Sequence, residues 1–348
     1  MTHQSINFGV VSRFYLIGGG QTLFDAASYL NSKKYDVTVL TSERHHASYV
    51  KHDEAIIRLW DALSLINVKS YLLSKFDTKH EAFKDFDSDS LLFTPSSEWI
   101  FTQEIIDRFN GRIVNIHGSA LPEMKGGGGL SWNLMMGERH GGCTIHLVDA
   151  GIDTGDILLQ QTYRLPNSVL NLEDALAYGS KQSTQLALSF LKKIESQATF
   201  NRTIQSPKAG SYWPRLKTDI HGFIDWNWTV SEISSFICAF GKPFKGASTF
   251  LAEKKVRIAA SEYEVEERKF HPFQYGLVFR VSDEKFYVAC KGGSLVIGDI
   301  FDDAGQRLDL TKLIGRRLHT PTHYLEAALR QRVVFAPVSD DDEYRTNL

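Results

Sequence analysis

The chain has 348 residues, enough for two domains, and its 43% hydrophobic and 23% charged residues are typical of a soluble globular protein. The formal net charge of -2 argues against a general polyanion-binding surface. The three cysteines, Cys143, Cys238 and Cys290, lack the paired spacing of a disulfide framework or a thiolate site, and we predict no metal. No signal-peptide pattern and no apolar window of about 18 residues is present, so we expect a cytoplasmic location and no membrane partner.

The first two hundred residues alternate between short apolar runs and longer amphipathic stretches. We predict strands at 14–20, 36–42, 90–97, 112–119, 143–149 and 156–165. We predict helices at 22–34, 53–66, 102–110 and 171–197. Continuous apolar strands alternating with helices are typical of a parallel sheet that is covered on both faces. Residues 1–200 are therefore predicted to form an α/β, Rossmann-like catalytic domain with a mostly parallel sheet.

The pattern changes after residue 200. Residues 201–222 are rich in Pro, Gly and polar side chains without a clear period, which predicts a linker. A helix at 231–241 and several short β-rich runs predict a small C-terminal antiparallel β-barrel-like domain over 223–315. Residues 316–348 are expected to form a terminal helix and a solvated acidic tail.

An asparagine and a histidine lie two positions apart at the end of one predicted strand, in the segment IVNIHGSALP. Because side chains alternate along a strand, Asn115 and His117 point to the same side, at the edge where open parallel sheets bind ligands. An amide and an imidazole side by side can stabilise an oxyanion and move a proton when an amine attacks a carbonyl. The loop after the next strand supplies carboxylates, Asp149, Asp153 and Asp156, that can orient the imidazole. On spacing alone, side chains that merely cap turns are an equally good interpretation.

The motifs around these residues resemble those of the formyltransferases that use 10-formyltetrahydrofolate. NIHGSALP, followed by Lys125 and Gly126, is similar to that family's N-x-H-x-S-x-L-P…R-G signature, with lysine where arginine is common. GCTIH and DTGDI match its G-x-T-x-H…D-x-G-x-I pattern. YWPRL, GFIDW and FICAFGKPFKGA resemble the linker and second domain of methionyl-tRNA formyltransferases and of formyltransferases that act on nucleotide-linked amino sugars. The resemblance covers roughly residues 90 to 300.

Carried over by position, the resemblance implies a catalytic set of Asn115, His117 and Asp153. His117 would relay the proton of the attacking amine, Asn115 would help to hold the oxyanion, and Asp153 would tune His117. N10-formyltetrahydrofolate is implied as co-substrate, bound by Ile100, Phe101, Asp149, Gly151 and Ile152. The acceptor is expected to contact Lys125, Gly126, Gly127, Tyr212 and Trp213.

Some features have competing interpretations. The run Gly126 to Gly129 is either a flexible loop or a stretch that lets the acceptor approach closely. Tyr212 and Trp213 either line an acceptor pocket or pack between domains. The histidines around residues 45 to 52 have no carboxylate or cysteine that completes a metal site, and we expect them in a surface loop.

The favoured acceptor is the amine of a nucleotide-linked amino deoxy sugar, a precursor of a surface polysaccharide such as lipopolysaccharide O-antigen. Methionyl-tRNA is the alternative, but residues 205–312 carry 15 Lys and Arg against 14 Asp and Glu, which does not favour a tRNA-binding surface. We therefore predict no nucleic-acid partner. N-hydroxyornithine as acceptor, formyl transfer to water and a binding module without catalysis stay open, although the intact triad argues against the last. The resemblance also implies a homodimer.

Overall fold

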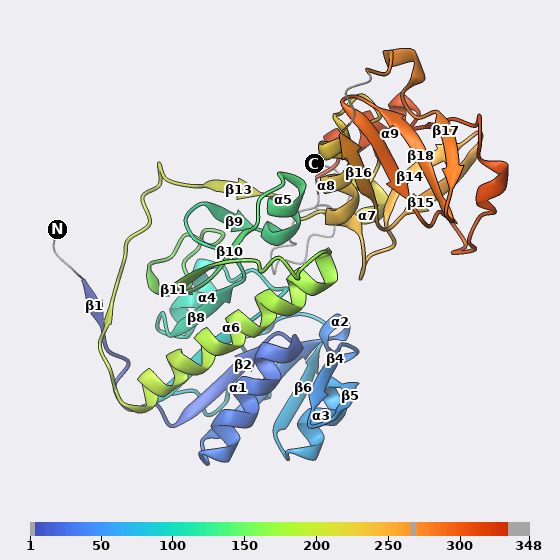
Figure 1. Ribbon diagram of the computed structural model, residues 1–348. Coiled ribbons are helices and arrows are strands. Elements are labelled where there is room, and N and C mark those ends of the chain that lie inside the picture. The colour runs from blue at the N-terminus through green and yellow to red at the C-terminus, as the bar shows by residue number, and fades with distance from the viewer. Residues whose placement is uncertain (1–3, 266–268, 333–348) are drawn as a thin grey trace.

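The computed structural model describes residues 4–265 and 269–332, which form two lobes (Figure 1). Within these residues the N-terminal lobe contains a seven-stranded sheet with the order β11-β10-β8-β7-β2-β3-β6. Its strands are β2 (Arg13–Ile17), β3 (Asp36–Ser42), β6 (Lys69–Leu73), β7 (Ser90–Pro95), β8 (Ile113–His117), β10 (His140–Leu147) and β11 (Ile157–Arg164). In sheet order, β8, β7, β2, β3 and β6 are parallel to one another. Strand β10 pairs antiparallel with β8, and β11 pairs antiparallel with β10. The predicted Rossmann-like, mostly parallel α/β sheet is confirmed.

The direction in which the chain crosses the sheet reverses beside β2. From β2 the chain runs outward through β3 to β6, and it then returns to β7 and continues through β8 to β10 and β11 on the other side. Open α/β sheets bind ligands at the carboxyl ends of strands next to such a reversal. Thr94 near the end of β7, and Asn115 and His117 near the end of β8, lie at this edge.

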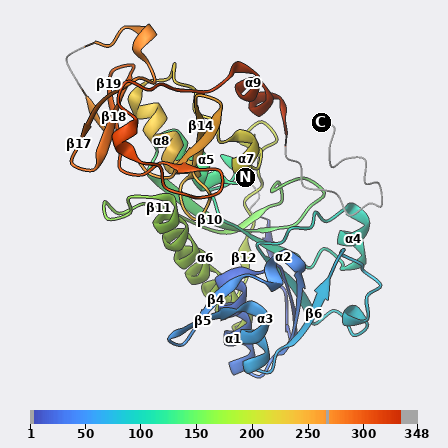
Figure 2. The ribbon, with the colours of Figure 1, turned by 90° about the vertical axis from the view of Figure 1, so that its right-hand side faces the viewer.

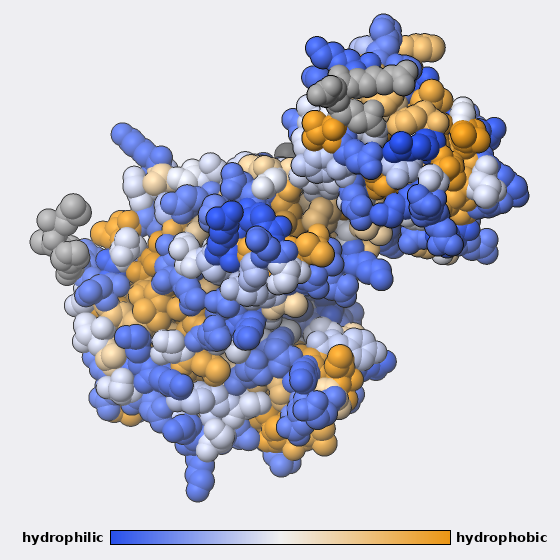
Figure 3. All heavy atoms as spheres, in the orientation of Figure 1, coloured by the Kyte–Doolittle hydropathy of each residue, from blue (hydrophilic) through white to orange (hydrophobic). Residues whose placement is uncertain are grey.

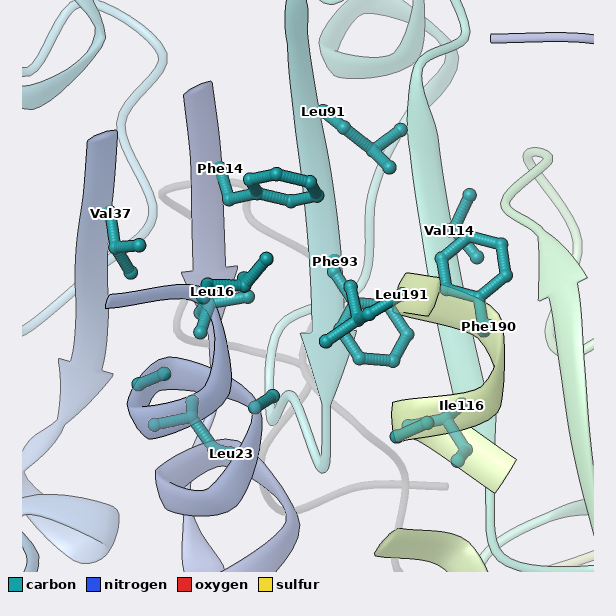
Figure 4. Packing of buried hydrophobic residues seen from close by; sticks show 14 of the residues in the cluster. Phe14, Leu16, Leu23, Val37, Leu91, Phe93, Val114, Ile116, Phe190 and Leu191 are labelled. Atoms are coloured by element: carbon teal, nitrogen blue, oxygen red, sulfur yellow. The ribbon is translucent and has the colours of Figure 1, made fainter. Parts of the chain in front are cut away.

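Helices cover both faces of this sheet. On one face lie α1 (Gly20–Ser32), α3 (Leu59–Leu65) and α6 (Leu172–Glu195), over a core that Figure 4 shows in part. On the other face lie α4 (Gln103–Arg108) and the 3-10 turn Glu81–Phe83, over a second core. Val114 and Ile116 belong to the first core, so the alternate residues of β8 face the opposite side.

The C-terminal lobe consists of helix α8 (Val230–Phe240) and two four-stranded antiparallel sheets (Figure 2). One sheet contains β20 (Phe301–Asp302), β15 (Lys254–Ile258), β14 (Ala247–Leu251) and β21 (Leu318–His319). The other contains β16 (Glu262–Val265), β19 (Gly293–Ile297), β18 (Lys285–Cys290) and β17 (Val278–Ser282). The lobe also has 3-10 turns at Pro272–Gln274 and Leu310–Lys312, and helix α9 (Thr322–Arg330) follows it. The predicted antiparallel β-rich fold is confirmed, and the predicted acidic tail lies outside the described residues.

The two lobes share an apolar contact. Helix α5 (Gly129–Met135) of the N-terminal lobe packs against α8. Leu130 and Leu134 of α5 belong to the same buried cluster as Ile233 and Ile237 of α8 and the inward side chains of the strands. The space-filling view in Figure 3 shows the lobes meeting at a narrower waist. This packing fixes the C-terminal lobe beside the carboxyl edge of the large sheet.

The predicted helix over 53–66 is wrong in its first half. Strands β4 (Tyr49–His52) and β5 (Ala55–Arg58) form a hairpin there, and the helix begins only at Leu59. The apolar spacing fits a helical period, but the turn at Asp53, with φ of 53°, brings the two segments together as strands. Pairing between neighbouring strands therefore overrides the local pattern.

The predicted linker over 201–222 is also more ordered than its composition indicates. It contains β13 (Ser211–Trp213) and the short helix α7 (Thr218–His221), and β12 (Phe200–Asn201) at its start pairs with β1 (Ser5–Ile6). Strand β13 pairs in parallel with β9 (Met124–Gly126), so partners distant in sequence supply its order. No helix in the described part of the chain is long and apolar enough to cross a membrane.

Candidate active site

A cleft of about 490 Å³ opens at the carboxyl edge of the large sheet. Its lining includes the three predicted catalytic residues, Asn115, His117 and Asp153. It also includes the predicted folate-contacting residues Ile100, Phe101, Asp149, Gly151 and Ile152 and, from the predicted acceptor side, Gly126 and Gly127. The other predicted acceptor residues, Lys125, Tyr212 and Trp213, are not among the described residues that line the cleft.

Neighbouring strands hold the Asn115 amide in one orientation. In the parallel ladder Thr94 lies opposite Asn115, and its hydroxyl donates to Asn115 Oδ1 at 2.8 Å. In the antiparallel ladder His146 lies opposite Asn115, and its Nε2 is 3.0 Å from Asn115 Nδ2. Since the carbonyl oxygen is taken by Thr94, the amide N–H groups are the ones turned toward His146 and the cleft. They are the groups that can donate to an oxyanion.

The backbone of β9 fixes the ring of His117. His117 Nε2 lies 2.7 Å from the carbonyl oxygen of Met124. A carbonyl only accepts hydrogen bonds, so Nε2 carries the proton in this contact. The other ring nitrogen, Nδ1, faces the carboxylate of Asp153 at 3.5 Å. Nδ1 is therefore the atom that can take up or release a proton at the site.

Asp153 lies between the two imidazoles. Its Oδ2 is 3.5 Å from His117 Nδ1 and its Oδ1 is 3.5 Å from His146 Nε2. The backbone N–H of Gly126, on β9, donates to Asp153 Oδ2 at 2.8 Å. Burial raises the pKa of this carboxyl. The positive charge of the His117 ring when it is protonated, the hydrogen bond and charge of His146, and the hydrogen bond from the Gly126 N–H together outweigh burial and lower the pKa to about 2. Asp153 is thus an anion throughout the neutral pH range.

The loop that carries Asp153 is held from outside. Asp153 has φ of 54°, a left-handed conformation that is uncommon for a residue with a side chain. The buried Gln205 donates through Nε2 to the backbone oxygens of Asp153, at 3.0 Å, and Gly155, at 2.7 Å. At the start of the loop, Asp149 Oδ1 accepts from the Thr154 hydroxyl at 2.6 Å. The sequence interpretation missed this support of the Asp153 loop, since Gln205 lies in the predicted linker.

Three predicted acceptor residues clamp the strand β9 instead of lining the cleft. The Tyr212 ring lies against Gly126, whose missing side chain leaves room for it. Trp213 Nε1 donates to the Glu123 carbonyl at 3.2 Å, and the Trp213 ring packs on Trp132 with 5.2 Å between centroids. Lys125 Nζ reaches the backbone oxygen of Ala209 at 3.5 Å. These contacts join β9, and through it His117 and Asp153, to the segment that leads to the second lobe.

Comparisons with known proteins agree with this architecture. A model of the formyl transferase family matches residues 80–175, and a model of the formyl transferase C-terminal domain matches residues 217–317. Together the two matches cover more than half of the chain, and the C-terminal-domain match follows the first match along the sequence.

The chain belongs to the formyl transferase family. It is 29% identical over 226 residues to a methionyl-tRNA formyltransferase of Acetivibrio thermocellus, covering 64% of this chain and 70% of that one. It is 32% identical over 212 residues to the methionyl-tRNA formyltransferase of Syntrophus aciditrophicus, covering 60% and 65%. This formyltransferase is therefore an enzyme of one-carbon transfer, as its motifs predicted.

Solved structures share the fold of this formyltransferase at lower identity. An N-formyltransferase from Helicobacter canadensis, in complex with folinic acid and dTDP-3-aminofucose, superposes with a TM-score of 0.63 at 19% identity, covering 86% of this chain and all of that one. WlaRD, a sugar 3N-formyl transferase in the presence of dTDP and 5-N-formyl-THF, also gives 0.63, at 18% identity, covering 86% and 99%. At such identity the likeness establishes the fold.

The cleft of this formyltransferase also has a charged side that the sequence interpretation did not identify. Arg44, His45, Glu98 and Arg215 all belong to its lining. The expectation that the histidines around residue 45 lie in a surface loop is wrong for His45, which is only 9% exposed. Its ring packs against Gly19, where any β-carbon would collide with it. No local pattern marks these residues, because three separate segments bring them together.

Proposed function

We propose that this formyltransferase transfers the formyl group of N10-formyltetrahydrofolate to the amine of a nucleotide-linked amino deoxy sugar. The observation that carries the proposal is that Asn115, His117 and Asp153 line one cleft, with His117 facing Asp153 directly and Asn115 linked to Asp153 through His146. An amide donor, an imidazole and an ionised carboxylate are the groups that transfer between two nitrogens requires. The product would be an N-formylated sugar for a surface polysaccharide such as O-antigen.

The proposed reaction proceeds through a tetrahedral intermediate. The acceptor amine attacks the formyl carbon, forming a new C–N bond, and the carbonyl oxygen becomes an oxyanion held by the Asn115 amide N–H. The amine proton passes to Nδ1 of His117, and the Asp153 carboxylate stabilises the resulting imidazolium. The bond to N10 of the folate then breaks as that nitrogen receives a proton from the cluster. Because Met124 already holds the proton of Nε2, the ring presents one defined nitrogen to the substrate.

The proposed folate site lies along the loop that carries Asp153. Ile100 and Phe101, after β7, would contact the flat pterin ring together with the loop 149–152. The loop has a fixed shape, because Asp149 accepts from the Gly151 N–H at 3.2 Å as well as from the Thr154 hydroxyl. The neighbours from Helicobacter canadensis and WlaRD, whose structures contain formyl folates, support this co-substrate.

Methionyl-tRNA is the second candidate acceptor, because the sequence relatives above are methionyl-tRNA formyltransferases. Phosphate neutralisation dominates tRNA affinity and needs a basic surface. The linker and second lobe, residues 205–312, have a net charge of about +1 from 15 basic and 14 acidic residues. The segment after the LP motif is a glycine run instead of a basic insertion. Both observations favour the amino sugar. No observation favours N-hydroxyornithine as the acceptor. The homodimer and the cytoplasmic location stay predictions.

The test is release of tetrahydrofolate from N10-formyltetrahydrofolate by the purified protein. The acceptors are 3-amino and 4-amino dideoxy sugars on UDP, dTDP and GDP, with methionyl-tRNA in parallel. The proposal expects turnover with an amino sugar nucleotide, lost in His117→Ala and kept in His140→Ala, a matched variant of an exposed histidine on β10. Turnover with tRNA alone would reject the acceptor, and equal turnover without any amine would mean that water is the acceptor.

A further inference from the structure

Two arginines from distant parts of the chain line the same cleft. Arg44 lies on the short helix α2 (Glu43–His46), directly after β3, and Arg215 lies between β13 and α7. Both belong to the lining of the cleft that contains His117. Neither has a part in the proton transfers proposed above. Their side chains bring positive charge to a cleft whose acid–base residues include the Asp153 anion.

The charges of Arg44, Arg215 and Glu98 influence the pKa values of the ionisable groups at this end of the cleft. Burial lowers the pKa of Arg215, and the charge of Arg44 lowers it further, while the Glu98 carboxylate raises it. Burial also lowers the pKa of His45, and the charge of Arg44 and, less strongly, of Arg215 adds to that effect. The acid that acts on both groups, among the described residues, is Glu98. Two guanidinium groups and one carboxylate therefore belong to this end of the cleft lining.

The glycine run lies beside this end without filling the cleft. Gly127 lies directly against Arg215, because a β-carbon on Gly127 would meet Arg215 Cβ at 2.9 Å. The preceding Gly126 donates its backbone N–H to Asp153. Two consecutive glycines therefore contact the arginine on one side and the acid–base cluster on the other. A molecule that spans both ends passes backbone that carries no side chains.

We propose that Arg44 and Arg215 form an anion subsite that binds phosphate groups of the acceptor while the acceptor amine lies at His117. The inference rests on the proposed function and adds to it the place of the diphosphate. A guanidinium binds phosphate through a planar pair of N–H donors, and two of them beside one carboxylate suit an anion with more than one charge. The glutamate carboxylates of the folate are also anions that two arginines can bind. The test therefore distinguishes acceptor phosphates from folate carboxylates.

The test measures binding directly, so that it does not depend on turnover. Isothermal titration calorimetry with UDP, dTDP, GDP and inorganic pyrophosphate is compared between wild type, Arg44→Gln and Arg215→Gln. The same proteins are titrated with 5-formyltetrahydrofolate that carries one or three glutamates. Loss of a charge-assisted contact raises the Kd of the bound nucleotide by about 10–100-fold in each variant, with folate affinity unchanged. Arg58→Gln, at an exposed arginine on β5 away from the cleft, leaves every affinity unchanged.

Arg44→Lys and Arg215→Lys keep the charge and are expected to recover only part of the nucleotide affinity, which separates binding from misfolding. The arginine variants could instead bind folate more weakly, or lose the dependence of folate affinity on the number of glutamates, while nucleotide binding stays intact. Either result would overturn the assignment of the subsite to the phosphates of the acceptor. No binding of any probe to wild type, or equal affinities in all variants, would overturn the subsite. Nucleotide binding that depends on both arginines without any amino-sugar turnover would support the subsite and count against the proposed acceptor.

Discussion

The two ends of the cleft are built in different ways. At the acid–base end, Asn115, His117 and His146 lie on adjacent strands of one sheet, and every polar contact described for them stays within the N-terminal lobe. At the arginine end, Arg44 and Arg215 come from segments more than 150 residues apart, and the second follows the clamp between β9 and β13. Strand register thus positions the proposed acid–base groups, whereas the proposed acceptor side depends on how distant segments assemble.

Removing the imidazole is expected to have the largest effect. His117→Ala eliminates the ring that accepts the amine proton, so we expect kcat to fall by about 10²–10⁴. Asn115→Ala removes the amide donor to the oxyanion and is expected to cost about 10²–10³. Steady-state kinetics checks both, with thermal denaturation showing that the variants are folded. If His117→Ala retains most of its kcat, the acid–base end is not where the proton moves.

A side chain at Gly126 is expected to break the link between the two ends. Gly126 has φ of 93°, and a β-carbon would meet the Trp213 backbone oxygen at 2.4 Å. The matched control is Gly111→Ala, where φ is 66° and nothing lies within 4 Å. We expect Gly126→Ala to lower the free energy of unfolding by about 1–3 kcal/mol more than the control, and to lower activity because its N–H leaves Asp153. Equal effects in chemical denaturation would show that the clamp is not tightly packed.

The charge of Asp153 gives the acid–base end a pH signature. Its pKa is lowered from an ordinary value of 3.8 to about 2, so the folded state favours the carboxylate. The stabilisation is complete above about pH 5 and is lost progressively as the pH falls to about 1, below both pKa values, for a total of about 2 kcal/mol. Urea unfolding of wild type and Asp153→Asn between pH 6 and 3 is expected to show the wild type losing more stability at the acid end. Parallel pH curves would mean that Asp153 titrates alike in the folded and unfolded chains.

Gln205 offers the smallest expected effect. Gln205→Leu keeps the size of the side chain but removes the two donors to the loop carbonyls. We expect unfolding free energy to fall by about 1 kcal/mol and kcat to fall with little change in KM, because Asp153 loses its fixed position. A change in KM for nucleotide alone would place Gln205 with the acceptor side instead.

The residues predicted for the acid–base end lie together in the structure, because the signals that group them are local. The two-residue period of β8 places Asn115 and His117 on one face, and the register of the sheet then adds His146. The arginine end was missed because Arg44 directly precedes the histidines that were expected in a surface loop, and Arg215 lies in a predicted linker. Tyr212 and Trp213 were assigned to the acceptor, but their contacts clamp β9.

The glycine run shows the same limit. Its composition indicated a loop, and the start of α5 at Gly129 depends on packing of Leu130 and Leu134 into the second lobe. Helix formation supported by tertiary packing has no local signature that a sequence pattern can reveal.

The most direct test of the central claim is the chemical identity of the formylated product. N10-formyltetrahydrofolate labelled with ¹³C in the formyl group is incubated with the protein and a mixture of amino sugar nucleotides and methionyl-tRNA, and the products are analysed by mass spectrometry. The account predicts a labelled formamide on an amino sugar nucleotide with wild type and none with His117→Ala. Label found only on methionyl-tRNA, or only in formate, would contradict it.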